Sequence, residues 1–215
     1  MVNTKMSVKT RACFAITLLC FLALAIVLTI AIAWLIYPLE IRWLNLDSVV
    51  KMAPDTIWHN FNILLNYLTN PFHWTLNMPD FQSSADGLHH FEAVKKLFHL
   101  AQGVFLVTLP IAWVFLKTIL QTRTKSLLSR GFASMALTPV IVAGFAGIIG
   151  FSQFFVLFHQ ILFPGDSTWL FHPARDPIIM ILPERYFLHC FILFFIIYET
   201  LAIGGYIWTR KNQLI

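Results

Sequence analysis

The stretch FFVLFHQILFPGDSTWLFHP, residues 154–173, is the part of the sequence that most constrains the fold. A strongly apolar segment carries His159 just before it ends, and the turn at residues 163–166 leads into a loop with Trp169. An imidazole about one helical turn inside a membrane surface is costly and is seldom without a function. The stretch therefore predicts the end of a membrane span that carries a candidate functional histidine.

The composition of the whole chain agrees with a membrane protein. The 215 residues are 58% hydrophobic and 12% charged, with a mean hydropathy of +0.73, which excludes an ordinary soluble domain. A hydrocarbon core about 30 Å thick needs about 20 helical residues to cross it. Four apolar runs are long enough, at residues 14–37, 97–116, 132–163 and 186–208. We predict an all-α integral membrane protein, a bundle of four transmembrane helices forming one domain, residues 1–215.

The distribution of charge predicts how the spans are oriented. Nine of the fifteen Lys and Arg residues lie in the two tails and in the loop after the second span, namely Lys5, Lys9, Arg11, Lys117, Arg123, Lys125, Arg130, Arg210 and Lys211. Nine of the ten acidic residues lie in the other two loops. By the positive-inside rule, both termini are cytoplasmic. The net charge of +5 then reflects topology, with membrane lipids as partners and no nucleic acid.

The segment at residues 38–96 is too long for a connector and too apolar to be disordered. We predict that it forms an extracytoplasmic cap, containing an amphipathic helix at the membrane interface that begins near Pro54 and ends at Asn70. A helical pattern that starts near Ser83 continues into the second span, so its first turns project outward with His89 and His90. Residues 164–185 form the second outer loop.

All eight histidines are predicted on or near the outer side of the membrane. Most suit an interface or a loop as polar aromatic residues, but His90 and His159 match in depth. At 1.5 Å per residue, His159 lies about 6 Å inside the turn at Phe163, and His90 lies about 10 Å outside Leu97. An imidazole titrates near neutral pH and suits proton transfer. Two interpretations remain: a catalytic acid–base pair, or two unrelated structural histidines.

Other chemistries have less support in the sequence. His89 and His90 with Asp86 offer metal ligands, but no HExxH or HxxEH motif is present. His99 and His189 could be axial ligands of a haem, which nothing else supports. There is no GxSxG nucleophile motif and no phosphate-binding loop. We therefore expect no metal and no cofactor, and direct acid–base chemistry fits best. Glu199, inside the fourth span, is expected to be a protonated, hydrogen-bonded packing residue.

Two blocks of sequence resemble the lipoprotein intramolecular transacylases of Gram-positive bacteria. The first, HFEAVK at residues 90–95, resembles that family's motif of His, an apolar residue, any residue, Asp, Val and Lys, but Ala93 replaces the acidic residue. The second block is more specific, and comprises Phe158-His159, Phe163, Gly165-Asp166-Ser167, Trp169, Asp176 and Leu182-Pro183-Glu184. The family's members have four spans and an extracellular cap.

The resemblance implies a reaction on a bacterial lipoprotein whose N-terminal cysteine carries a diacylglyceryl group. The acyl chain at sn-2 moves to the cysteine α-amine, which gives an N-acyl lyso-lipoprotein at the outer face of the bacterial cell membrane. The amine must lose a proton before it attacks, and the glyceryl oxygen must gain one as it leaves. His90 and His159 would serve these steps, although His89 competes with His90 for the role. Phe158, Trp169 and Asp176 would line or order the substrate pocket.

Two other functions stay open at this point. One is a membrane lipid hydrolase, or an acyltransferase that uses a separate donor. The other is a non-catalytic transporter or binding protein, with the polar residues of the third span lining a path. Against transport, the sequence has no internal repeat, and Glu199 is its one clear intramembrane charge. We expect a monomer that binds the diacylglyceryl lipoprotein.

Overall fold

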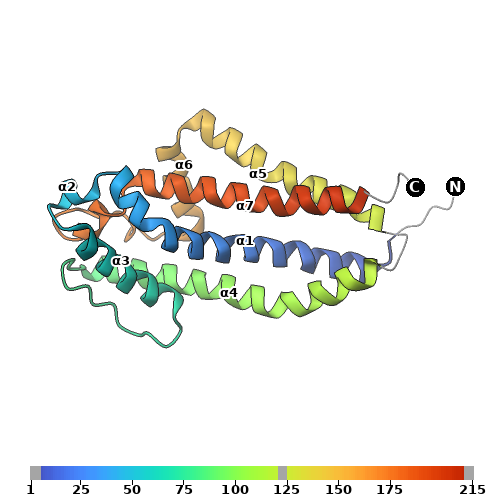
Figure 1. The fold of residues 1–215 in the computed structure, drawn as a ribbon, viewed down its shortest axis with the longest axis horizontal. Coiled ribbons are helices and arrows are strands. Elements are labelled where there is room, and N and C mark those ends of the chain that lie inside the picture. Colours follow the sequence, from blue (N-terminus) through green and yellow to red (C-terminus); the bar gives the residue numbers. More distant parts are fainter. Residues whose placement is uncertain (1–5, 121–124, 211–215) are drawn as a thin grey trace. The chain divides into compact units, whose positions relative to one another are not determined.

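Helices joined by loops make up the chain over residues 6–120 and 125–210, the part that this computed structural model describes (Figure 1). No β-strand occurs within those ranges. In chain order the elements are α1 (Val8–Trp43), α2 (Leu46–Val50), α3 (Pro54–Thr69), α4 (Ala85–Leu120), the short 3₁₀ helix η1 (Lys125–Leu128), α5 (Ser129–Ile149), α6 (Phe151–Leu162), the 3₁₀ helix η2 (Pro177–Met180) and α7 (Glu184–Arg210). The predicted all-α class is confirmed.

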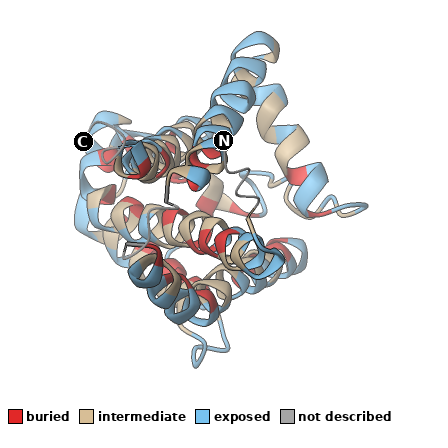
Figure 2. Cartoon of the chain, turned by 90° about the vertical axis from the view of Figure 1, so that its right-hand side faces the viewer, coloured by how far each residue is buried: buried red, intermediate tan, exposed pale blue. Residues whose placement is uncertain are grey.

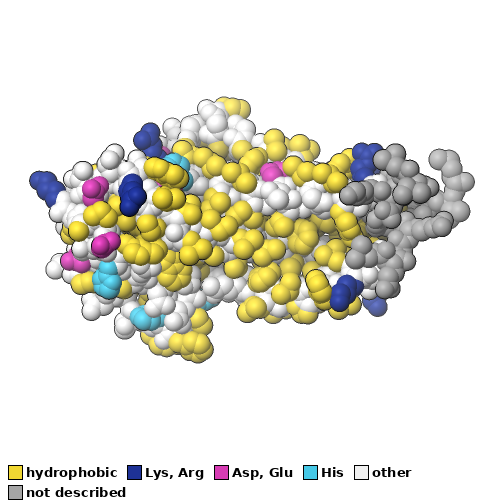
Figure 3. Space-filling view, in the orientation of Figure 1, with side chains coloured by type: hydrophobic (Ala, Val, Ile, Leu, Met, Phe, Trp, Pro, Cys, Tyr) yellow, Lys and Arg dark blue, Asp and Glu magenta, His cyan; other side chains and the backbone are white. Residues whose placement is uncertain are grey.

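Four of the helical segments are long and apolar enough to cross a membrane, as predicted. They are Val8–Trp43, Ala85–Ile119, Ser126–Ile149 and Glu184–Arg210. Buried positions lie on the inner sides of the helices and exposed positions on the outer sides (Figure 2). Hydrophobic side chains cover much of the helical surface (Figure 3), and on α4 Leu106 and Val107 are 67% and 68% exposed. A surface of this kind suits lipid.

The largest departure from the predicted spans is at Gly150. Residues 132–163 were expected to form one long helix, but α5 ends at Ile149 and α6 begins at Phe151. Gly150 between them has φ 85° and ψ 149°, a backbone conformation that residues with a Cβ rarely adopt. Residues 151–162 of the predicted span, including His159, therefore form a separate helix, α6.

The other predicted boundaries shift less. α1 continues through Pro38 to Trp43, beyond the predicted end at Tyr37. α4 is continuous from Ala85, so the turns that carry His89 and His90 do extend the second span, as expected. The orientation of the termini stays a prediction, and the charged residues Lys5, Arg123 and Lys211 on which it partly depends lie outside the described residues.

The backbone forms two compact units, and the boundary between them falls within α1, α4, α5 and α7. Unit 2 comprises residues 29–100 and 146–193 and is built on one hydrophobic core. At its centre the rings of Tyr37 and Phe61 stack with centroids 3.4 Å apart, and Tyr186 meets Tyr37 edge-on at 5.4 Å. The Tyr37 hydroxyl donates a hydrogen bond to the carbonyl oxygen of Ile181 (2.6 Å).

The predicted amphipathic helix is α3, and its apolar face is part of this core. Ile57 and Phe61 are fully buried, and Leu64 is 1% exposed. These side chains pack among Tyr37, Ile178 and other core residues. The apolar face of α3 is therefore part of the protein core, and the location of this helix at the membrane interface stays a prediction.

Unit 1 comprises residues 1–28, 101–145 and 194–215, and its core is smaller and built on phenylalanine. Phe14 packs edge-on against Phe132 with ring centroids 5.3 Å apart. A Cβ at Gly131 would lie 2.2 Å from the Phe14 ring, so only glycine allows this contact. Glu199 lies in α7 of this unit. Its Oε1 atom is buried and has no hydrogen-bond partner among the described residues, so the predicted hydrogen bond is not observed for this atom.

Candidate active site

The two histidines that the sequence paired by depth meet in unit 2. His90 lies in the second turn of α4, and His159 lies near the end of α6. Their ring centroids are 5.8 Å apart, and the planes are inclined by 37°. His90 is 7% exposed and His159 is 8% exposed. The two imidazoles are therefore close neighbours, and both are nearly buried.

Aromatic rings surround both imidazoles. Phe163 and Phe171 meet the ring of His90 edge-on, at centroid distances of 5.0 and 5.5 Å. Trp169 stacks on the ring of His159 at 4.6 Å with planes 26° apart, and Phe155 lies 4.3 Å away. The pair is thus enclosed by apolar surface, which raises the cost of charge on either ring.

Phe158, predicted as a substrate-binding residue, lies at the edge of this group. Its ring is 5.6 Å from that of His159 and 4.9 Å from that of Phe191 on α7, edge-on in both cases. The side chain therefore joins α6 to α7 next to the histidine.

A backbone hydrogen bond fixes the orientation of His159. Its Nδ1 lies 2.8 Å from the carbonyl oxygen of Phe155. A carbonyl oxygen only accepts, so Nδ1 carries the proton, and the lone pair of the neutral ring is on Nε2. Burial lowers the pKa of His159 below its usual value, and the hydrogen bond to Phe155 opposes part of that effect. At neutral pH the ring is therefore an unprotonated base.

His90 has the opposite pattern of contacts. Its Nδ1 atom is buried and has no hydrogen-bond partner in the described part of the chain. A buried polar atom without a partner is uncommon in proteins and is often found at a functional site. The hydrogen-bonding capacity of this nitrogen is therefore unused within the described residues.

The structure separates His90 from its neighbour His89. Successive residues point about 100° apart around a helix, so both cannot face His159. His89 is exposed instead, and its Nε2 lies 3.5 Å from Oδ2 of Asp166. Of the two, His90 is the one beside His159.

Asp166 also shapes the loop that carries Trp169. Its Oδ1 accepts a hydrogen bond from the Thr168 amide (2.8 Å), and its carbonyl oxygen accepts one from Trp169 Nε1 (3.0 Å). The hydrogen bond from the Thr168 backbone amide is the main cause of the lowered pKa of Asp166, and the nearby His89 lowers this pKa further. An ionised Asp166 thus holds the loop in the shape that places Trp169 on His159.

Asp176 binds the beginning of α4. Its Oδ1 accepts from the Ser84 amide (2.7 Å), and its Oδ2 accepts from the Ser84 hydroxyl (2.8 Å). Ser84 Oγ in turn accepts from the amide of Gly87 (3.0 Å). A carboxylate here satisfies free amides at a helix N-terminus and complements its dipole. Both oxygens of Asp176 are therefore engaged in holding the turn before His90.

Sequence reasoning missed several residues of the site. Phe155 could have been found, because it precedes His159 by four residues and so lies on the same helical face. Ser84 could not be paired with Asp176 from the sequence, because the two residues are 92 positions apart. Phe171 had no signal in the sequence, since its contact with His90 depends on the path of the loop after α6.

The candidate metal and haem ligands named from the sequence do not form a metal cluster among the described residues. Within residues 6–120 and 125–210, no group of three or more His, Cys, Asp or Glu residues is arranged to hold a metal ion. Asp86 is exposed on the first turn of α4. His189, a candidate haem ligand, lies with its Nδ1 2.8 Å from Oε2 of the buried Glu40.

Fold and site together define an integral membrane protein with four spans and a buried histidine pair. The chain belongs to the lipoprotein intramolecular transacylase (Lit) family, whose family model matches residues 12–187. The family is one of acyltransferases that act on lipoproteins, so the predicted family and enzyme class are confirmed.

Solved structures agree with this assignment. The lipoprotein intramolecular transacylase of Bacillus cereus, solved in meso, is 28% identical with a TM-score of 0.84, and the match covers 96% of this chain and 99% of that one. A variant of that protein with a histidine replaced by arginine is 27% identical with a TM-score of 0.76, covering 94% and 91% of the two chains. A variant with an alanine replacement has a TM-score of 0.78 at 28% identity, covering 96% and 94%. No match was found among curated proteins.

Proposed function

We propose that this protein moves the sn-2 acyl chain of a diacylglyceryl-cysteine lipoprotein to the α-amine of the same cysteine, by histidine acid–base catalysis. The observation that carries the proposal is the buried pair of His90 and His159, with ring centroids 5.8 Å apart inside an aromatic enclosure. The reaction needs one group that accepts a proton and one that donates a proton, and two imidazoles can meet both needs.

The contacts of each ring favour a division of roles. His159 has its lone pair on Nε2, because Nδ1 is bonded to the carbonyl oxygen of Phe155. It is the general base that takes a proton from the amine as the amine nitrogen attacks the ester carbonyl carbon. His90, with its unpartnered Nδ1, stabilises the oxyanion and donates a proton to the glyceryl oxygen. Transfer of a proton from His159 to His90 then restores both rings.

The reaction balances within one molecule. A C–N bond forms to the acyl carbon, the C–O bond to the sn-2 oxygen breaks, and the amine proton ends on the freed hydroxyl. Donor and acceptor belong to the same substrate, so the enzyme contributes mainly orientation and protection from water. Trp169, Phe163 and Phe171 support this protection because their rings enclose the imidazoles.

The three predicted substrate-pocket residues have different parts in this proposal. Trp169 lines the pocket by its stack on His159, and Phe158 supports the same ring from its edge. Asp176 is a positioning residue, since its carboxylate binds Ser84 at the start of α4. It orders the helix that carries His90 and does not itself contact the substrate.

We further propose that the pair works at the outer face of the bacterial cell membrane, with residues 38–96 as an extracytoplasmic cap. The basic tails and the basic loop after α4 support this orientation. The substrate is then a membrane-anchored lipoprotein, whose ester groups lie at the interface. We expect the protein to act as a monomer without a metal or other cofactor.

Tandem mass spectrometry of a diacylglyceryl lipopeptide, incubated with the purified protein in liposomes, tests this function. An intramolecular shift leaves the total mass unchanged and leaves one acyl chain on the N-terminal fragment ions that have lost the glyceryl thioether. Loss of a fatty acid would instead indicate hydrolysis, and a gain of mass would indicate a separate acyl donor. An unchanged substrate would favour a transporter or binding protein.

A further inference from the structure

Lys95 is a buried charged residue that the histidine chemistry does not use. It lies in α4 and is 8% exposed. Its Nζ donates hydrogen bonds to the carbonyl oxygens of Asn70 (3.1 Å) and His73, and lies 4.3 Å from the ring centroid of Tyr67. A buried ammonium group needs such partners to offset its lost hydration. All three belong to the end of α3 and the loop that follows, so Lys95 fastens this loop to α4.

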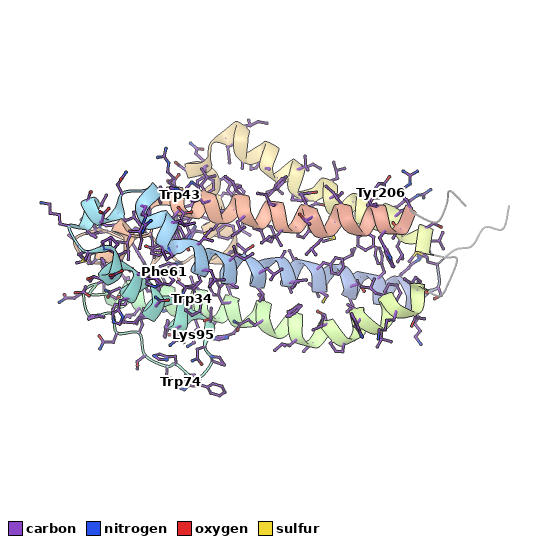
Figure 4. All side chains as sticks on the ribbon, in the orientation of Figure 1. Trp34, Trp43, Phe61, Trp74, Lys95 and Tyr206 are labelled. Atoms are coloured by element: carbon purple, nitrogen blue, oxygen red, sulfur yellow. The ribbon has the colours of Figure 1, made fainter. Side chains whose placement is uncertain are left out.

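The fastened loop, residues 71–79, presents two large aromatic side chains to the outside. Phe72 is 83% exposed and Trp74 is 80% exposed. The stretch from Pro71 to Pro79 contains no Asp, Glu, Lys or Arg. Figure 4 shows Trp74 directed away from the helices, with Lys95 at the base of the loop. Exposed aromatic groups of this size usually mark an interaction surface.

The loop has a defined backbone, so the exposure of these rings is built into the fold. The amide of Phe72 donates to Oδ1 of Asn70 (2.9 Å), and the amide of His73 donates to the Asn70 carbonyl oxygen (3.3 Å). Asn66 Nδ2 lies 3.2 Å from His73 Nδ1. Together with Lys95, these contacts hold the turn from which both rings extend.

The point of attachment on α4 indicates what covers the rings. Lys95 precedes Leu97, where the apolar part of the span begins, by two residues, or about 3 Å of helix. Leu106, eleven residues after Lys95 and therefore on the same face of α4, is 67% exposed. The aromatic loop thus adjoins the lipid-facing surface of a spanning helix at the level where the membrane begins. Trp and other aromatic residues favour that interfacial level.

We propose that residues 71–79 form a lipid-anchoring loop, in which Phe72 and Trp74 insert into the interfacial zone of the bilayer that surrounds α4. Lys95 is the positioning residue that holds this loop at its depth. The partner is the lipid bilayer, because the loop carries no charge to pair with a protein and adjoins a surface that already faces lipid. The proposal does not depend on the acyl-transfer chemistry.

Photocrosslinking in liposomes tests the proposal with the full chain. A benzoylphenylalanine placed at Phe72 or Trp74 is irradiated in vesicles of phosphatidylglycerol and phosphatidylethanolamine, and adducts are identified by mass spectrometry. We expect lipid adducts at both positions and at Leu106, an exposed position within α4. Asp55, exposed on the first turn of α3, is the control and should give several-fold less lipid adduct.

Replacing the fastening residue sharpens the test. Lys95→Met, combined with the probe at Trp74, should lose most of the lipid adduct, while the adduct at Leu106 persists and shows that the protein is still inserted. Lys95→Arg should retain part of it. Adducts at Phe72 and Trp74 to a second copy of the chain, or a lipid yield no higher than at Asp55, would overturn the proposal even if Lys95→Met does not fold.

Discussion

The two compact units differ in what their cores contain. Unit 2 holds all eight histidines of the chain and several buried polar contacts, among them Asp176 with Ser84 and Glu40 with His189. Unit 1 is built around Phe14 and Phe132. Buried polar groups are costly and persist where they fix a specific geometry. The difference places the candidate chemistry in unit 2 and leaves unit 1 a role in helix packing.

The strongest test of this contrast is to remove one imidazole from unit 2. His90→Ala or His159→Ala should lower kcat/KM for the lipopeptide by about 10²–10⁴-fold, because each change removes a proton-transfer group. His89→Ala is the matched control and should keep most of the activity, since that side chain is exposed beside Asp166. Full activity in either single variant would refute the histidine pair.

A second test removes the carboxylate that holds the start of α4. Asp176→Ala leaves two donors of Ser84 unpaired, so the free energy of unfolding should fall by about 1–3 kcal/mol, and kcat should fall as His90 loses its position. The measurements are thermal unfolding in detergent and the lipopeptide assay. Glu92→Ala, which removes an exposed acidic residue from the same helix, should leave stability nearly unchanged.

Gly87 offers a check on the geometry of the same contact. A Cβ at this position would lie 2.2 Å from Oδ1 of Asp176, so Gly87→Ala should also destabilise the protein. Because the clash is with Asp176 itself, adding Gly87→Ala to Asp176→Ala should cost little more, and the two effects should not add. Additive effects in the same unfolding assay would argue against this contact.

The pH dependence of unit 2 follows from the buried state of His159. Burial lowers the pKa of this ring, and the base must be unprotonated to accept a proton. Protonation of His159 should therefore not limit activity as pH falls through the ordinary histidine value of about 6.5, but only at the lower pKa of the folded protein. Protonation of the substrate α-amine, at about 7.7–8.0, lowers activity separately. Stability should decline between about pH 6.5 and the lower pKa, because the unfolded chain binds the proton first. Stability that does not fall as pH is lowered below about 6.5 would contradict this.

The smallest effect is expected in unit 1. Glu199→Gln keeps the size of the side chain and removes its acidic proton, and Glu199 belongs to the unit without histidines. We expect kcat to change by less than about tenfold, or less than about 1.4 kcal/mol in activation free energy. Abolished activity, with unfolding unchanged, would show that unit 1 also takes part in the chemistry.

Much of the architecture could be predicted because it depends on local pattern. The four apolar runs gave four spans, and the depths of His90 and His159 could be estimated from the rise of a helix. The break at Gly150 could have been anticipated less easily, since the apolar run continues on both sides of it. Glycine permits the positive φ found there without requiring it.

The sequence by itself determined the helical class, the spans and the histidines that are candidates for chemistry, because hydrophobic runs and helical periodicity are properties of neighbouring residues. Only the tertiary structure decided that His90 and not His89 lies beside His159. It also decided that Asp176 binds Ser84, 92 positions away in the chain, and that Lys95 holds the loop after α3. These choices depend on which helix faces meet, and hydrogen bonds between distant residues leave no periodic signal in the sequence.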